Sequence, residues 1–449
     1  CAVQWLRQGK RLECALACLL ALLAIGRGME VLRDWSGPGG SLTTELYLPA
    51  ICFAQDRGFI NVAVDEVPGM RAFLDFQAPS LAPGACASSR PVAWEAHQKY
   101  HRYLIWYVGA FWKLFGVSWE TMKLPIVLLF LCFILLNYAL FRLAMPPLFS
   151  FGFAVAVCFS PAACDTLPVV RDFGKGPFFL AVLLPLAWLL VKPRTRRSLV
   201  GAAAVLGIAV GIGIGFRRDL GVSIPIVALI LLGCRCVAFR YALLTRLAAC
   251  GVFAGLFLVF SWPIVRSFQE EGSLGAHDAI MGFDPRCESE MSLYKSSYER
   301  MTLGNDLYIG AFVSGFEQID RKVFGSDTIN ASSDKEGYLK AVAAALPADM
   351  LARVYASILA IVKGGCRDIV ELTPSGRFFA YTGPLLAVFA LALVAVRDLR
   401  TAFLAAALLL YFCGYTSLQM HPRHVFHLAF VPFWLLGFSI GHTFRFLRS

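Results

Sequence analysis

Charged residues are scarce in this chain of 449 residues: Asp, Glu, Lys and Arg make up 16% of it, whereas 58% is hydrophobic. Soluble domains average about 25% charged and about 45–50% apolar residues, so a single soluble core is excluded. Intrinsic disorder is excluded because disordered segments are poor in apolar residues. Alternating strands of about ten residues are also lacking, which excludes a β-barrel. We therefore expect an all-α polytopic membrane protein.

Metal and nucleotide motifs are lacking as well. The 14 cysteines form no CxxC pair and no Cys/His metal spacing, and most lie in apolar runs, where Cys acts as a small hydrophobe. Four cysteines lie in long polar segments and can form disulfides in an oxidising compartment, although the sequence leaves their pairing open: Cys52, Cys86, Cys287 and Cys366. The glycine-rich run 207–215 lies inside an apolar segment, which favours close helix packing over phosphate binding.

Long apolar runs are abundant. A helical span needs roughly 20 apolar residues, and the chain offers candidates near 12–31, 122–142, 147–164, 177–192, 199–216, 220–238, 246–264, 378–396, 401–419 and 424–443. Arg7, Lys10 and Arg11 before the first run resemble the start of a signal peptide. No convincing small-residue cleavage site follows, so we interpret this run as a retained first helix.

The distribution of basic residues orients these runs. The net charge of +11 is typical of cytoplasmic loops rich in Lys and Arg, and we expect no nucleic-acid partner. If the aromatic segment 103–115 does not cross the membrane, every basic short loop falls on the cytoplasmic side. If it does cross, the basic stretch 192–197 is placed outside. The sequence therefore predicts ten spans, two cytoplasmic termini, and a segment 103–115 in the outer interface.

This topology divides the chain into three parts. An N-terminal transmembrane module covers 1–264 and includes a first outer loop at 32–121. A second outer loop covers 265–377, and C-terminal helices cover 378–449. The segment 338–363 of the second loop has the pattern of an amphipathic juxtamembrane helix. Its charges interrupt it too often for a span, so we expect it along the membrane surface, with a break at Pro347.

Charged side chains gather at helix ends on the non-cytoplasmic side, where the positive-inside rule expects few cations. They are Glu30, Arg33, Asp34, Glu45 and Asp56; Arg171, Asp172 and Lys175; Arg217, Arg218 and Asp219; and His421, Arg423, His424 and His427. Arg and Lys suit phosphate oxygens, and a nearby carboxylate can act as general base or hold a metal. The pattern favours a substrate with a lipid tail and a phosphate or pyrophosphate head.

Each group also has a plain structural interpretation. Arg217 and Asp219 can form a simple ion pair at a helix end, and 171–175 can be an ordinary loop. His424 and His427 are three residues apart without a partnered acid, which disfavours a metal site. The functional interpretation rests on the occurrence of all these groups on one side of the membrane.

Three stretches carry a resemblance to a known family. The first outer loop has Glu45-Leu-Tyr followed by Arg57-Gly-Phe, and an aromatic segment ends in LFGVSWETMKLP at 114–125. The last span begins PRHVFHLAFVPFWLLGF at 422–438. With the long loop after the first helix, this pattern resembles the GT-C superfamily of polytopic glycosyltransferases. It looks most like the bacterial branch related to protein O-mannosyltransferases and lipid A aminoarabinose transferase.

The resemblance implies transfer of a sugar from a polyprenyl-phosphate carrier to a lipid, glycan or protein acceptor on the outer face of the membrane. A carboxylate of the first outer loop would act as base or help place a divalent metal. Glu45 matches that motif position, and Asp34 is the alternative. The donor phosphate would be bound by Arg171, Lys175, Arg217, Arg218 and Arg423, with Asp172, Asp219 and His424 as further candidates. The implied location is a bacterial inner membrane with the site facing the periplasm.

The chain also departs from the family pattern. Thr44 precedes Glu45 where the mannosyltransferases have an Asp-Glu pair, and His424 stands where Tyr is common. The alternative function is a transporter or flippase for a lipid-linked or anionic substrate. A transporter should carry polar residues at mid-membrane and inverted repeats, and the mid-span positions of this chain are almost entirely apolar. A non-catalytic assembly subunit is a third hypothesis.

Overall fold

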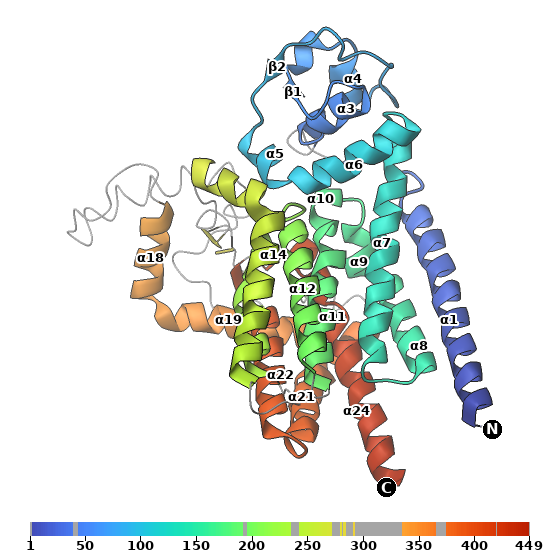
Figure 1. Cartoon of the computed structure of the whole chain (residues 1–449), viewed down its shortest axis with the longest axis vertical. Coiled ribbons are helices and arrows are strands. Elements are labelled where there is room, and N and C mark those ends of the chain that lie inside the picture. The colour runs from blue at the N-terminus through green and yellow to red at the C-terminus, as the bar shows by residue number, and fades with distance from the viewer. Residues whose placement is uncertain are drawn as a thin grey trace.

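The structure is a computed structural model, and it describes residues 2–38, 44–191, 195–234, 242–271, 279–280, 282–283, 291, 335–364, 374–418 and 420–448. Long helices stand side by side in a bundle, and a small domain formed by the first long loop covers one end (Figure 1). Both chain termini lie at the opposite end (Figure 1). We name these two ends the site end and the termini end.

Eight helices in the described part of the chain are long and apolar enough to cross a membrane. In lipid a helix satisfies its own backbone hydrogen bonds, which is why such apolar runs fold as helices. The helical elements behind these spans are α1 (Ala2–Val31), α7 (Trp119–Arg142), α10 (Val170–Phe173) with α11 (Lys175–Val191), α12 (Arg196–Gly213), α14 (Ala242–Glu271), α21 (Pro374–Ala395), α22 (Leu399–Gly414) and α24 (Val431–Arg448). The predicted all-α polytopic membrane protein is confirmed.

Two of the ten predicted spans are shorter than expected. The run 147–164 divides into α8 (Pro147–Cys158) and α9 (Pro161–Thr166), because Pro161 cannot continue a helix and Ser160 caps the new one. The described part of the run 220–238, which ends at 234, forms the 11 residues of α13 (Ser223–Gly233), since the 3₁₀ turn η2 (Arg218–Val222) takes its first residues. Helices α8 and α9 still lead the chain from the termini end toward the site end (Figure 1).

The glycine-rich run packs as expected. Gly207 and Gly211 lie on α12 where it meets α14: a Cβ on Gly207 would approach the carbonyl oxygen of Phe253 to 2.7 Å, and one on Gly211 would approach the Cβ of Phe260 to 2.8 Å. Neither position has room for a larger residue without displacing α14. The predicted close packing of these helices is therefore confirmed.

The first long loop folds into a small domain of short elements, which we call the loop domain (residues 44–118). It contains α3 (Leu48–Ala54), β1 (Asn61–Val62), η1 (Val64–Glu66), α4 (Met70–Leu74), β2 (Pro91–Val92), α5 (Ala96–Tyr100) and α6 (Arg102–Phe115). The two strands pair antiparallel, with Asn61 opposite Val92. Helix α6 lies across the end of the bundle (Figure 1). Its 14 residues form no candidate span, as predicted for 103–115.

The second long loop is described only in part. Its amphipathic segment forms α18 (Lys335–Ala345) and α19 (Pro347–Val362), which meet at an angle of 94°. The predicted break at Pro347 is confirmed. Taken together, the two helices are long and apolar enough for a span, so their charged residues exclude a span less strongly than the sequence suggested. Helix α19 packs against α21, α22 and α24, because its buried face includes Ala356, Ser357 and Ala360.

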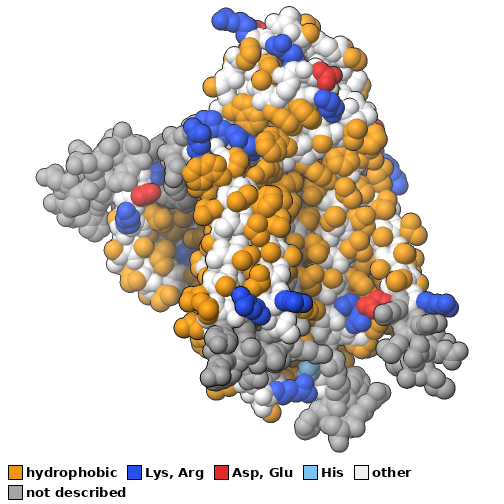
Figure 2. Space-filling view, in the orientation of Figure 1, with side chains coloured by type: hydrophobic (Ala, Val, Ile, Leu, Met, Phe, Trp, Pro, Cys, Tyr) orange, Lys and Arg blue, Asp and Glu red, His pale blue; other side chains and the backbone are white. Residues whose placement is uncertain are grey.

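The bundle presents a broad apolar face over α14, α12 and α7, with charged side chains gathered toward its two ends (Figure 2). This is the surface expected of a protein embedded in lipid. At the termini end, Arg142 ends α7, Arg196 begins α12, and Arg397 and Arg400 flank the turn between α21 and α22. These described basic residues therefore share one end, as the positive-inside argument predicts. The division into three domains stays a prediction.

Candidate functional site

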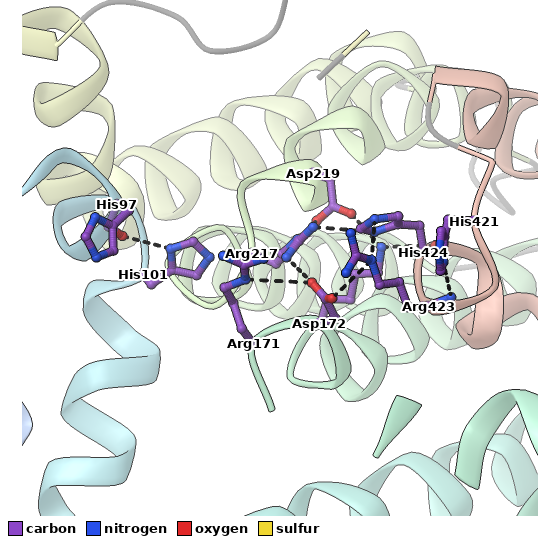
Figure 3. Close-up of polar contacts among 10 residues, drawn as sticks. His97, His101, Arg171, Asp172, Arg217, Asp219, His421, Arg423 and His424 are labelled. Atoms are coloured by element: carbon purple, nitrogen blue, oxygen red, sulfur yellow. Dashed lines mark hydrogen bonds and ion pairs between the residues drawn. The ribbon is translucent and has the colours of Figure 1, made fainter. Parts of the chain in front are cut away.

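Three segments that are far apart in the sequence meet at the site end. They are α10 with the first residue of α11, the turn η2, and the single-turn helix α23 (Pro422–Val425). Each is a short element at the end of a longer helix, and each carries an Arg next to another polar residue. Together they form what we call the Asp172 cluster: Arg171, Asp172, Lys175, Arg217, Asp219, Arg423 and His424 (Figure 3).

The carboxylate of Asp172 lies at the centre of this cluster and is fully buried. A guanidinium nitrogen of Arg217 is in direct contact with its Oδ1. Nε of Arg423 lies 3.6 Å from its Oδ2, and Nε of Arg171 lies 3.9 Å from its Oδ1. A buried carboxylate is costly unless it is paired, and this one has three arginines converging on it (Figure 3).

Lys175 is the most deeply buried cation of the cluster. Its side chain is 1% exposed, and its Nζ lies 2.6 Å from Oδ2 of Asp219 and 3.1 Å from the backbone oxygen of His424. Burial alone would raise the pKa of Asp219, but the charges of Lys175 and Arg217 outweigh it and hold that pKa below its ordinary value. Lys175 thus fixes η2 and α23 in place, and does not itself face solvent.

The charges of the cluster do not cancel. Among the described residues it holds four cations, on Arg171, Lys175, Arg217 and Arg423, and two carboxylates, which leaves a net charge of +2. The two most accessible cations are Arg423, whose side chain is 38% exposed, and Arg171, at 30%. The open side of the cluster is therefore positive, which suits an anion.

The imidazole of His424 lies between two of the arginines. Its Nδ1 is 3.4 Å from a terminal nitrogen of Arg217, and its Nε2 is 3.2 Å from Nε of Arg423. A neutral imidazole has one lone pair on its ring nitrogens, so it can accept a hydrogen bond from only one of the two guanidinium groups. The imidazole lies between the two guanidinium groups and can accept a hydrogen bond from only one of them at a time.

Two histidines of the loop domain, which the sequence argument missed, lie beside the cluster (Figure 3). Nδ1 of His101 donates to the backbone oxygen of His97 at 2.8 Å, so its Nε2 carries the lone pair. That Nε2 is buried without a hydrogen-bond partner among the described residues. Burial, together with the charges of Arg217 and Arg171, lowers the pKa of His101 to about 3. The only signal in the sequence is the spacing of the two histidines, four residues apart before an aromatic helix.

Glu45 lies near this group but pairs elsewhere. Its carboxylate is 28% exposed and lies 3.7 Å from Nη1 of Arg71. Its backbone oxygen accepts a hydrogen bond from Gln98 at 3.0 Å, which ties the Glu45 segment to α5. Burial and the charge of Arg171 lower the pKa of His97, while Glu95 and Glu45 raise it, so Glu45 and Arg171 both act on one imidazole.

The other predicted residues separate into two groups. Asp34 is exposed just after α1, next to Trp35, whose indole donates to the backbone oxygen of Pro168 at 3.2 Å. Arg218 lies over the ring of Tyr100, 5.8 Å from its centroid, and its charge acts on His101. The structure thus brings Arg171, Arg217 and Arg423 together, as expected for an anion site, but sends Arg218 toward α5.

The described residues do not fit a divalent metal. No group of three or more His, Cys, Asp or Glu side chains in that part of the chain is placed to hold an ion. Asp172 and Asp219, the carboxylates at the centre, are already in contact with cations, and a dication would be repelled there. We therefore derive no step through a metal.

No family model matches the sequence, and no curated protein matches it. The structure is similar to a solved structure described as the archaeal oligosaccharyltransferase AglB from Archaeoglobus fulgidus in complex with an inhibitory peptide and a dolichol-phosphate. The TM-score is 0.48 and the sequence identity 13%. The match covers 98% of this chain and 52% of that chain, so this chain spans about half the length of AglB. We draw no functional conclusion from this similarity.

Proposed function

We propose that this protein is a membrane glycosyltransferase that moves a sugar from a polyprenyl-phosphate carrier to an acceptor on the outer face of the membrane. The observation that carries the proposal is the Asp172 cluster, a net positive site at one end of an apolar helix bundle. Arginine presents a planar fork that matches phosphate oxygens, and Arg171 and Arg423 are the accessible ones.

An apolar cavity supports a lipid carrier in particular. It has a volume of about 530 Å³ and is lined by residues of α7, α11, α21, α22 and α24. Phe412 and Leu428 line it near the Asp172 cluster, and Leu143 and His442 line it toward the termini end. A phosphate held by the arginines would place an attached isoprenoid chain within reach of this cavity, where burial of its methylene groups is favourable.

The proposed reaction is a direct displacement. A general base deprotonates an acceptor hydroxyl, whose oxygen attacks the anomeric carbon while the bond to the lipid phosphate breaks, so the anomeric configuration inverts. The arginines stabilise the negative charge that develops on the leaving phosphate. Glu45 is the proposed base and Asp34 the alternative.

The proposed location is a bacterial inner membrane with the site end in the periplasm. Membrane lipids surround the apolar face, and the acceptor is a lipid, glycan or protein. The concentration of short basic loops at the termini end supports this orientation, because cytoplasmic loops collect Lys and Arg.

A flippase for the same kind of lipid is the second candidate, and one observation favours it. The bend of 94° between α18 and α19 resembles the broken helices of transporters. A flippase would bind the lipid-linked donor without consuming it. Turnover with a hydroxyl acceptor therefore separates the two candidates.

The first experiment measures donor binding. The protein is purified in detergent, its co-purifying lipids are analysed by mass spectrometry, and added polyprenyl phosphate is titrated. Arg423→Ala should weaken binding about 10- to 100-fold, since a hydrogen bond to a charged group contributes about 1.5–3 kcal/mol.

Arg218→Ala is the matched control, because Arg218 is the neighbour of Arg217 but contacts Tyr100 instead of Asp172. It should retain wild-type affinity. Equal affinity in wild type and Arg423→Ala, or the absence of polyprenyl-phosphate binding in the wild type, would contradict the proposed site.

A further inference from the structure

Two cysteines of the loop domain meet in its core. Cys52 on α3 and Cys86 in the segment that follows α4 each have 0% exposure and belong to the same cluster of buried residues. Both thiols are free in the structure, and each shifts the pKa of the other, so the two side chains lie close together. A buried thiol pair between two segments of a loop domain has the arrangement from which a disulfide forms.

Hydrogen bonds that do not involve sulfur hold the two segments in register. Just beyond the end of α3, Gln55 donates from Nε2 to the backbone oxygen of Ala82 at 2.9 Å and accepts at Oε1 from the backbone N–H of Cys86 at 2.9 Å. Arg57 donates to the backbone oxygen of Ser89 at 2.9 Å. These bonds hold the end of α3 beside the segment 82–89 whatever the oxidation state of the two cysteines.

We propose that Cys52 and Cys86 form a structural disulfide in the mature protein. The inference rests on the proposed placement of the site end outside the cytoplasm, because disulfides persist in oxidising compartments. The oxidant is a disulfide of a thiol oxidase or of glutathione. The Cys86 thiolate attacks it and releases one thiol, and the Cys52 thiolate then attacks the mixed disulfide and releases the second. Two thiols are oxidised to one disulfide while the oxidant disulfide is reduced to two thiols.

Cys86 is suited to the first attack. The hydrogen bond from Cys52, aided by the charge of Arg57, lowers the pKa of Cys86 against the opposing effect of burial. Gly84 and Ala87 on either side are exposed, so opening of this short segment gives an oxidant access. The bond would fasten α3 to the segment 82–89. Because α3 directly follows the Glu45 segment, the link would also restrain the proposed base.

Peptide mapping tests the proposal. Membranes are dissolved in denaturant with iodoacetamide, which blocks free thiols, and digested with trypsin without reductant. Cys52 falls in the peptide 34–57 and Cys86 in 72–99, because trypsin does not cleave between Arg90 and Pro91, and each peptide contains a single cysteine. The expected product is the two peptides joined, lighter than their sum by two hydrogen atoms. Reduction should release both peptides.

Cys52→Ser is the matched control, in which Cys86 should become fully alkylated. Alkylation of both cysteines in the wild type, or a link from either to Cys287 or Cys366, would overturn the proposal. Donor binding measured on the same preparation separates this inference from the proposed function. Reduced thiols with intact binding would refute the disulfide alone, and a linked pair without binding would refute the donor site alone.

Discussion

The two ends of the helix bundle use the same residue types in different ways. At the termini end three arginines have separate local partners: Arg246 donates to the backbone oxygen of Cys234 at 2.9 Å, Arg400 donates to that of Gly233 at 2.9 Å, and Arg142 pairs with Glu13 at 2.8 Å. At the site end three arginines converge on one buried carboxylate and leave a positive excess. The first arrangement closes helix ends, and the second forms a site for an anion.

The largest expected effect is a difference in labelling between the two ends. Arg218→Cys at the site end should react with a membrane-impermeant maleimide added to intact cells, and Arg196→Cys at the termini end should not. Labelling above the wild-type background is the measurement. Reaction of Arg196→Cys from outside would overturn the proposed orientation, and with it the distinction between the ends.

The second prediction compares two glutamates, each paired with an arginine. Glu45→Gln should lower turnover about 10²- to 10⁴-fold with donor binding retained, which is the usual contribution of a general base. Glu13→Gln, at the termini end, should keep wild-type turnover because its carboxylate only pairs with Arg142. Glycosyl transfer from a polyprenyl-phosphate donor is the assay.

Asp34→Asn decides between the two proposed bases. It should behave like wild type if Glu45 is the base. Equal activity of Glu45→Gln and Asp34→Asn would remove the assignment of Glu45.

The third prediction compares the stability of the two ends. Asp172→Asn leaves the mostly buried guanidinium group of Arg217 without its carboxylate, so the free energy of unfolding should fall by about 3–5 kcal/mol. Glu13→Gln should cost about 0–1 kcal/mol, since its carboxylate and Arg142 both reach solvent. Chemical unfolding in detergent measures both. A similar loss of unfolding free energy in both variants would mean that Asp172 stabilises the fold no more than an exposed ion pair does.

The smallest expected effect is a pH dependence confined to the site end. The folded protein keeps His101 neutral down to a pKa of about 3, whereas the unfolded chain takes up a proton near 6.5. The unfolded state therefore binds more protons in this window, and the contribution of His101 to the free energy of unfolding should fall by about 1.4 kcal/mol per pH unit as the pH drops through it.

The arginine–carbonyl contacts of the termini end do not titrate in this range. His101→Gln should remove the contribution of His101 to the slope of unfolding free energy against pH. Thermal unfolding between pH 4 and 7 measures this slope. An unchanged slope would show that His101 is not buried as a neutral imidazole.

The sequence predicted which segments form the site, but it did not predict which side chains of those segments meet. Placing 171–175, 217–219 and 421–424 at one end required only the order of the spans and the basic loops. Adjacent arginines could not be told apart: Arg217 contacts Asp172 from the extended position before η2, whereas Arg218 begins η2 and lies over Tyr100. His101 was missed because its importance comes from Arg171 and Arg217, which are remote in sequence.

Eight of the ten predicted spans follow from the sequence alone. A long apolar run in lipid has to satisfy its own backbone hydrogen bonds, and an α-helix does so without any partner. The Asp172 cluster depends on the tertiary structure. Burial of Asp172 is tolerable only when cations from three separate segments surround it, and their convergence is fixed by how α10, η2 and α23 pack together. The local sequence determines where each helix forms. Packing between segments that are distant in sequence determines which charged side chains meet in the Asp172 cluster.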